Sequence, residues 1–125
     1  MDIKDVILIV DDDSIFCKAM KRLLEKSGCR AAAVGDGQEA IDFLAKHPVN
    51  LIVSEVKMPK FSGIEFMEEI KRREIDAPVI FITAWGEIES YMELMNMGAF
   101  DYLNKPLRNQ EILSVVKRAM RSRGA

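Results

Sequence analysis

The stretch Asp5-Val6-Ile7-Leu8-Ile9-Val10-Asp11-Asp12-Asp13 decides the fold expected of this chain. Its five consecutive apolar residues, four of them β-branched, are typical of a strand buried on both faces of a parallel sheet. Three carboxylates follow at once, where that strand leaves the sheet. Because like charges repel by about 4 kcal/mol per pair at ~4 Å and an effective dielectric constant near 20, a nearby cation would stabilise them. For the triplet alone, the alternative is a solvated acidic turn that begins the next helix.

The composition indicates one globular domain over residues 1–125. The chain is 49% hydrophobic and 30% charged, with a net charge of −2, which argues against a dedicated nucleic-acid surface. It has no apolar run long enough for a membrane span and no signal-peptide pattern, so we expect a cytoplasmic protein without membrane contact. Cys17 and Cys29 lack metal-ligand spacing and are expected to be reduced thiols. His47, the only histidine, is expected at a helix end.

Strands and helices alternate along the rest of the chain. Apolar residues recur at helical spacing from Ile15 to Leu24, with Ser14 as the expected cap and Gly28 as the expected end. Further strands are expected at 31–34, 51–53, 79–82 and 100–103, and further helices at 38–46, 64–73, 87–97 and from 108 or 109 onward. This alternation predicts a single α/β domain of the doubly wound, flavodoxin-like kind. Its parallel five-stranded sheet has the order 2-1-3-4-5 and helices on both faces.

Polar residues follow four of the predicted strands directly. Asp11 and Asp12 follow the first strand, and Glu55, Thr83 and Lys105 stand at or just after the ends of three others. Because the carboxyl ends of parallel strands share one edge of the sheet, these side chains are expected to meet. One polar strand end would be ordinary, but three acids, a hydroxyl and a lysine together predict a site.

Longer motifs surround these strand ends. They are the acidic pair Asp11-Asp12, the loop Lys57-Met58-Pro59 with Gly63, the pair Thr83-Ala84, and the run Gly98-Ala99-Phe100-Asp101-Tyr102-Leu103-Asn104-Lys105-Pro106. With them the sequence resembles, over essentially its whole length, the receiver domain of bacterial two-component response regulators. The last run is most similar to receivers attached to transcriptional activators of the NtrC type.

The resemblance implies a magnesium site. Asp12 would bind Mg²⁺ directly, Asp11 would bind it through water, and the backbone carbonyl of Lys57 would be another ligand. Glu55 would complete the acidic set. Hard oxygen ligands together with several waters are what Mg²⁺ requires.

The resemblance also implies roles for residues at the later strand ends. Lys105 would pair with a phosphoryl group and Thr83 would hydrogen-bond to it. Tyr102 would be an aromatic switch that turns inward when Thr83 moves. The Lys105–Pro106 peptide bond is expected to be cis, which is uncommon even before proline.

Glu55 departs from the family pattern at the phosphoacceptor position, where the family has aspartate. The extra methylene moves the carboxylate by roughly 1.3 Å, and a displacement of order 1 Å can cost ~100-fold in a positioned reaction. We therefore expect no ordinary phosphorylation and only weak Mg²⁺ binding. A glutamate also extends toward Lys105 and Thr83, as a phosphoryl group would. We expect Glu55 to contact Lys105, to favour the active arrangement partially, and to leave Tyr102 inward.

The resemblance further implies partners. The input would be a sensor histidine kinase or a phosphotransfer protein, and the output a downstream effector domain or protein. Contacts would be made through the fourth helix, fifth strand and fifth helix, and the same face could form a homodimer. No enzymatic activity and no direct nucleic-acid binding are expected. Trp85 is expected near the mouth of the site.

Two alternatives remain open at this stage. The first is a haloacid-dehalogenase-like phosphatase, because Asp11, Asp13, Thr83 and Lys105 fit its motifs loosely. Against it, Ile15 stands where that family has Thr or Val, and no acidic pair follows the lysine. The second is a structural adaptor that has lost its metal and phosphoryl chemistry. The fluorescence of Trp85 in such an adaptor should not respond to Mg²⁺.

Overall fold

The computed structural model describes residues 5–58, 60–84 and 88–124. Strands and helices alternate throughout this part of the chain, as predicted. The elements are β1 (Val6–Val10), α1 (Ser14–Lys26), β2 (Arg30–Val34), α2 (Gly37–Lys46), β3 (Leu51–Ser54), α3 (Gly63–Arg72), β4 (Val79–Thr83), α4 (Ile88–Asn96), β5 (Asp101–Asn104) and α5 (Asn109–Gly124). Predicted and observed ends agree to within one or two residues.

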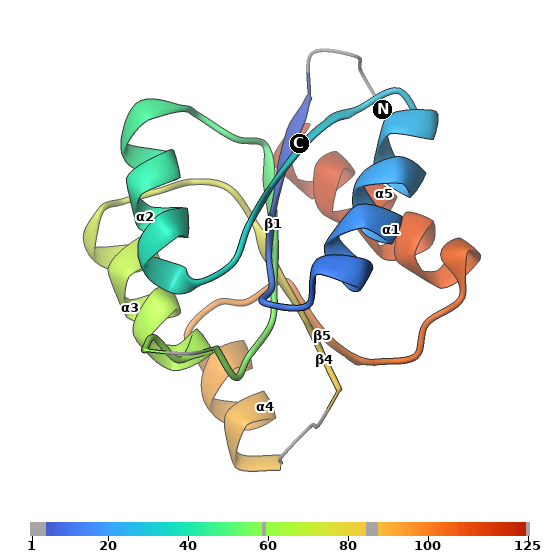
Figure 1. Ribbon diagram of the computed structural model, residues 1–125. Helices are drawn as coiled ribbons and strands as arrows, with labels where there is room; N and C mark the ends of the chain where they lie inside the picture. Colours follow the sequence, from blue (N-terminus) through green and yellow to red (C-terminus); the bar gives the residue numbers. More distant parts are fainter. Residues whose placement is uncertain (1–4, 59, 85–87, 125) are drawn as a thin grey trace.

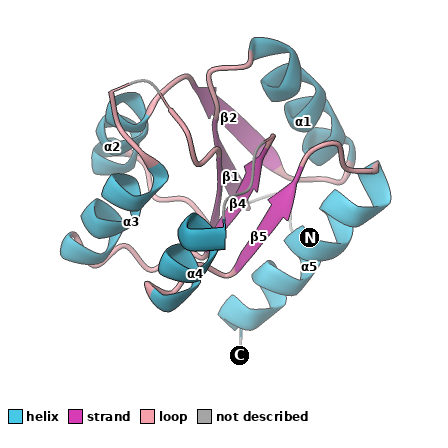
Figure 2. Cartoon of the chain, turned by 90° about the horizontal axis from the view of Figure 1, so that it is seen from below, coloured by secondary structure: helices cyan, strands magenta, loops and turns pink. Residues whose placement is uncertain are grey.

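The five strands form one parallel sheet in the order β2-β1-β3-β4-β5, which confirms the predicted topology. Helices α1 and α5 cover one face, and α2, α3 and α4 cover the other (Figure 1). Viewed from the edge where the strands end, the sheet lies between these two layers (Figure 2). That edge is the one at which the sequence predicts a site.

The sheet buries both of its faces, as the apolar strand sequences require. Along β1, Ile7 and Ile9 join the core under α1 and α5, whereas Leu8 and Val10 join the core under α2, α3 and α4. All four of these residues are completely buried. A five-residue strand can serve two cores because successive side chains point to opposite faces.

The start of α1 differs from the prediction in two ways. Asp13, not Ser14, caps the helix: its Oδ1 accepts hydrogen bonds from the amides of Ile15 and Phe16 at 3.0 and 3.1 Å. Ile15 was expected on the apolar face, but 79% of it is exposed. Phe16 is the first residue of α1 that packs against the core. At the other end, Gly28 adopts the expected left-handed conformation, with φ of 95°.

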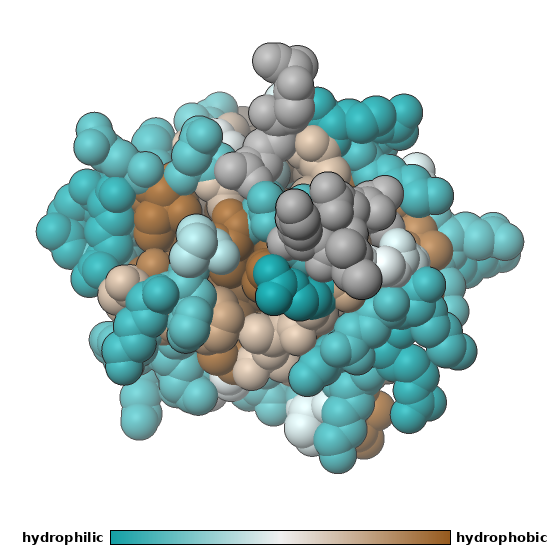
Figure 3. All heavy atoms as spheres, turned by 90° about the horizontal axis from the view of Figure 1, so that it is seen from above, coloured by the Kyte–Doolittle hydropathy of each residue, from teal (hydrophilic) through white to brown (hydrophobic). Residues whose placement is uncertain are grey.

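Seen from the opposite edge, where the strands begin, hydrophilic side chains form the rim of the molecule and hydrophobic ones are visible further in (Figure 3). Among the described residues, no helix is long and apolar enough to cross a membrane.

Gly37 lies against Phe61 in the loop between β3 and α3, and we predict that this contact tolerates no side chain. A Cβ on Gly37 would lie 2.7 Å from Cγ and 2.8 Å from Cβ of Phe61, so the whole ring would have to move. Gly37→Ala should lower the free energy of unfolding by about 1–3 kcal/mol, although alanine is the better helix former. Urea denaturation would measure the change.

Gly35→Ala is the matched control for this prediction. A Cβ on Gly35 would meet only Oε1 of Glu39, at 3.2 Å, at the end of a flexible side chain. The expected change is therefore within about 0.5 kcal/mol of zero. Equal stability of the two variants would show that the packing of Phe61 does not constrain this loop.

Candidate functional site

The predicted site residues are held together by backbone hydrogen bonds between neighbouring strands. The amide of Glu55 donates to the carbonyl of Val10 at 2.8 Å, which places Glu55 beside Asp11 at the end of β1. The amide of Lys105 donates to the carbonyl of Thr83 at 2.8 Å, which ties the end of β5 to the end of β4. The sheet therefore brings residues from four strand ends to one edge.

Lys105 joins two buried carboxylates at the centre of this edge. Its Nζ donates to Oδ2 of Asp11 at 2.8 Å and to Oε2 of Glu55 at 3.4 Å. Asp11 is only 3% exposed and Glu55 only 7%. The predicted contact between Glu55 and Lys105 is confirmed, but the distances show that Lys105 is bound more closely to Asp11.

The other oxygens of the two carboxylates bind backbone amides. Oδ1 of Asp11 accepts from the amide of Asp13 at 2.9 Å, and Oε1 of Glu55 accepts from the amide of Val56 at 2.8 Å. Each carboxylate is thus held by one backbone donor and one shared ammonium group. Such charge-assisted bonds hold both carboxylates and the ammonium group in a fixed orientation.

Burial of the Lys105 ammonium group lowers its pKa, but the hydrogen bond to Asp11 and the charges of Asp11 and Glu55 outweigh that effect. The net result is a pKa raised above the ordinary value of 10.5. Lys105 is therefore charged at neutral pH, as its predicted role requires.

The remaining predicted magnesium ligands belong to residues at the surface of this edge. Asp12 and Lys57 are both exposed, while the ammonium group of Lys105 occupies the position between Asp11 and Glu55. Across the ranges that the structure describes, no three acidic, thiol or imidazole side chains converge to hold a metal ion. The donors nevertheless fit Mg²⁺ chemically, because carboxylate and carbonyl oxygens are its preferred ligands.

The predicted switch residues lie on neighbouring strands, two residues apart in register, because Tyr102 is paired with Phe81 and Thr83 with Asn104. Thr83 ends β4 and is buried, and Tyr102 in the neighbouring strand β5 is 8% exposed. The burial of Tyr102 agrees with the expected inward position, while its role as a switch stays a prediction. The Lys105–Pro106 bond is cis, as expected. Trp85, and Pro59 of the loop motif, lie outside the described residues.

Two residues near the site were not predicted from the sequence to be part of it. Phe16 was read as an ordinary core residue, but Nζ of Lys105 lies 4.0 Å from the centre of its ring. Cys17 is a buried thiol whose Sγ donates to the carbonyl of Asp11 at 3.3 Å. Burial, followed by the charge of Asp11, raises the pKa of Cys17 to about 11, so it remains a protonated thiol at neutral pH. The only sequence signal for either residue is its place one turn beyond the acidic triplet.

Comparisons with known proteins agree with this geometry. Residues 7–117 match the family model of the response regulator receiver domain. The chain is 30% identical to the C4-dicarboxylate transport transcriptional regulatory protein DctD of Pseudomonas aeruginosa, with 98% of this chain and 26% of that protein aligned. It is 31% identical to the DNA-binding transcriptional regulator NtrC of Escherichia coli, with 94% of this chain and 25% of that protein aligned. The chain therefore spans about a quarter of the length of these relatives.

A solved receiver domain has the same fold as this chain. The signal receiver domain of a putative LuxO repressor protein from Vibrio parahaemolyticus superimposes with a TM-score of 0.92 at 25% sequence identity. The superposition covers 97% of this chain and 93% of the other. The likeness thus includes the whole sheet and the edge at which the candidate site lies.

Proposed function

From the premise that this chain belongs to the response regulator receiver domain family, we propose that residues 1–125 form a signalling receiver in which Glu55 occupies the phosphoacceptor position. Receiver domains of response regulators are signalling modules that interact with histidine kinases and with effector domains. Here the input is a sensor histidine kinase or a phosphotransfer protein. The domain is cytoplasmic, has no enzymatic turnover of its own and does not bind nucleic acid directly.

The observation that carries the proposal is the contact between Glu55 and Lys105. Glu55 directly follows β3, is buried, and directs Oε2 toward the ammonium group at 3.4 Å. A phosphoryl group on an acceptor at this position would present negative oxygen to the same lysine. Glu55 supplies one negative charge there, compared with about two for a phosphoryl group. It is therefore a partial and permanent substitute for the signal.

The size of this bias is limited by Asp11, which holds Lys105 at the shorter distance of 2.8 Å. A charge-assisted hydrogen bond contributes ~1.5–3 kcal/mol, and only part of that differs between the two arrangements of the domain. A difference of about 1.4 kcal/mol changes a population ratio tenfold. We therefore expect a mixture of arrangements rather than a locked active state.

NMR spectra of wild type, Glu55→Asp and Glu55→Gln test this bias. Without a phosphodonor, neither variant can place a full negative charge against Lys105 as Glu55 does, because aspartate is one methylene shorter and glutamine is uncharged. Their signals from Tyr102 and α4 should therefore shift in the same direction, away from wild type. Glu68→Gln removes a charge from the exposed face of α3 and should leave those signals in place. Superimposable spectra for wild type and both Glu55 variants would show that Glu55 mimics nothing.

Weak Mg²⁺ binding is the second part of the proposal. Asp11, Asp12 and Glu55 carry three negative charges against the single charge of Lys105, so a divalent cation would reduce the repulsion that remains. Asp12 is exposed and able to turn, and the carbonyl of Lys57 would complete the set of ligands. The bound ion would supply charge neutralisation at the acidic edge.

Calorimetric titration with Mg²⁺ checks this part. Wild type should bind Mg²⁺ with a dissociation constant in the millimolar range, corresponding to about 4 kcal/mol. Asp12→Ala should bind measurably less, because a direct ligand is lost. Asp42→Ala, which removes an exposed carboxylate from α2, is the control and should bind as wild type does. Equal binding by Asp12→Ala and wild type would contradict the ligand assignment.

We propose that the output passes through the face formed by α4, β5 and α5, which is also the face of a homodimer. The support is a ring contact: Tyr102 on β5 meets Tyr91 on α4 edge to face, with centroids 5.4 Å apart. Tyr91 is half exposed, and beside it on α4 Ile88 and Met92 are exposed. A change in the position of Tyr102 would therefore move an apolar surface that a partner could contact.

Both alternative functions have weaker support. The phosphatase alternative needs Asp13 at the site, but the Asp13 carboxylate caps α1 instead. The adaptor alternative needs the acidic edge to be without chemistry, whereas the structure holds two buried carboxylates and a charged lysine there. A response to Mg²⁺ that depends on Asp12 would exclude the adaptor.

A further inference from the structure

Phe16 lies against the lysine at the centre of the site. Nζ of Lys105 is 4.0 Å from the centre of the Phe16 ring, within the range in which an aromatic face attracts a cation. Phe16 belongs to the first turns of α1, whereas Lys105 follows β5. The contact therefore joins a helix on the face of the sheet to the edge that carries the carboxylates.

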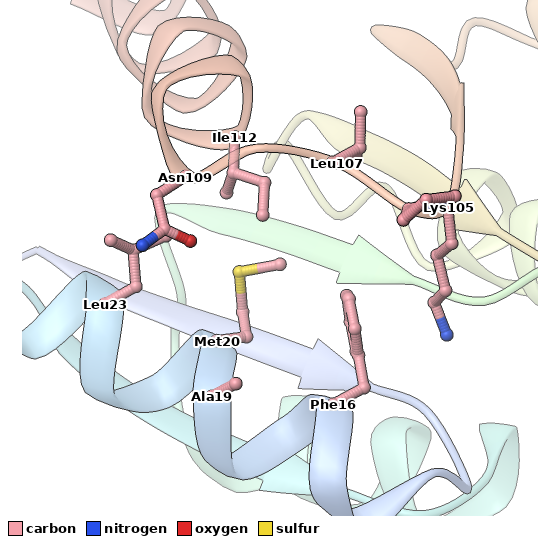
Figure 4. Close-up of a pocket in the computed structure, with 9 residues that line it drawn as sticks. Phe16, Ala19, Met20, Leu23, Lys105, Leu107, Asn109 and Ile112 are labelled. Atoms are coloured by element: carbon pink, nitrogen blue, oxygen red, sulfur yellow. The ribbon is translucent and has the colours of Figure 1, made fainter.

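A cavity of about 260 Å³ lies between α1 and α5, beside this contact. Its walls are mostly apolar. They include Phe16, Met20, Leu23, Leu107 and Ile112, together with Lys105 itself. In Figure 4, Phe16 stands between Met20 and Lys105, and Leu23 lies at the far end of the cavity from the lysine. Phe16 and Lys105 therefore line the same end of the cavity, and the ring lies where the lysine adjoins it.

The hydrogen bonds to the two carboxylates hold Lys105 unequally. Its flexible stem has many rotamers, and holding it in one of them costs entropy. The bond to Asp11 at 2.8 Å is short, but the bond to Glu55 at 3.4 Å is long and weak. A third contact that restricts the stem would matter most for the weaker bond.

We propose that Phe16 is a positioning residue: its ring holds the ammonium group of Lys105 toward Glu55 and keeps it out of the cavity between α1 and α5. This proposal rests on the proposed function only for the role of Lys105, which is to pair with a phosphoryl group or with Glu55 in its place. Loss of the ring should leave the pairing with Asp11 and weaken the pairing with Glu55. The contact between β5 and β3 at this edge would then depend on a residue of α1.

NMR of the side-chain ε-methylene of Lys105 tests the proposal, because protons above an aromatic ring are shifted upfield. In wild type this signal should be upfield of the other lysines and show a nuclear Overhauser effect to the Phe16 ring. Phe16→Tyr keeps an aromatic face and should keep the shift. Phe16→Leu keeps apolar bulk without the ring and should lose it, with the ratio of held to released lysine falling roughly two- to thirty-fold. The carboxyl ¹³C signal of Glu55 should change in that variant alone.

Leu23→Ala is the matched control, because it removes apolar volume from the same cavity at the end away from Lys105. It should leave both signals unchanged. An ordinary lysine shift in wild type, or an unchanged Glu55 signal in Phe16→Leu, would overturn the proposal. Should Phe16→Leu fail to fold, the wild-type Overhauser effect and the shift in Phe16→Tyr decide it. None of these measurements uses a phosphodonor or Mg²⁺. Their outcome is therefore independent of the labelling and Mg²⁺ titration that test the proposed function.

Discussion

Glu55→Asp should make the domain accept a phosphoryl group from acetyl phosphate about 100-fold faster than wild type does. Attack in line with the leaving group needs a carboxylate oxygen placed to a fraction of an ångström. In wild type the longer side chain carries its oxygens past that position, and both of them are already bound, one by the Val56 amide and one by Lys105. Aspartate would withdraw the carboxylate by one methylene and leave room for the phosphoryl group beside Lys105.

Intact-protein mass spectrometry would follow this labelling, and release by hydroxylamine would identify an acyl phosphate. Glu68→Asp makes the same change on the exposed face of α3 and should remain unlabelled. If wild type labels as fast as Glu55→Asp, Glu55 is an ordinary acceptor and the proposed function loses its central argument. Labelling of Glu55→Asp that disappears with Asp12→Ala would connect the acceptor to the acidic pair.

Lys105→Met should cause the largest loss of stability, about 3 kcal/mol or somewhat more at neutral pH. The substitution keeps the volume of the stem but leaves the buried carboxylates of Asp11 and Glu55 without their shared cation. Their bonds to backbone amides remain, so we expect the lower end of the range measured for broken buried pairs. Urea denaturation would measure the change.

The pH dependence of this loss provides a second test. The pKa of Lys105 is raised above 10.5 in the folded state, so the stability that its charge contributes is fully present below about pH 10.5. That contribution disappears as the pH rises through the raised value. The difference between wild type and Lys105→Met should therefore be constant from neutral pH to about pH 10 and narrow above it.

Arg118→Met is the control for the loss of an ion pair. Arg118 pairs with Asp101 at 3.4 Å on the surface, and 54% of its side chain is exposed. Such pairs contribute about 0–1 kcal/mol. An equal effect of the two substitutions would mean that solvent screens the acidic edge despite its burial.

Most of the fold could be predicted from the sequence because its signals are local. Five apolar residues in β1, helical spacing in α1 and a glycine at its end each depend on neighbours a few positions away. The topology follows from the alternation of elements and the handedness of their connections. The cap of α1 could not be predicted in the same way, because Asp13 and Ser14 are both good capping residues and stand next to each other.

The members of the site could also be predicted, because parallel strands bring their carboxyl ends to one edge whatever else the chain does. Position at a strand end was enough to assign four residues to the site: Asp11, Glu55, Thr83 and Lys105. The contact between Glu55 and Lys105 followed from the length and direction of the two side chains. To that extent, the sequence by itself determined the fold and the composition of the site.

Only the tertiary structure decided how the site is arranged, because the arrangement depends on differences of less than an ångström in the distances between residues far apart in the chain. It places Lys105 closer to Asp11 than to Glu55, which limits how far Glu55 can act as a signal. It leaves Asp12 exposed and sets the ring of Phe16 against the lysine. Residue type and spacing specify which groups meet at a sheet edge. Only the folded structure shows which of them share a charge.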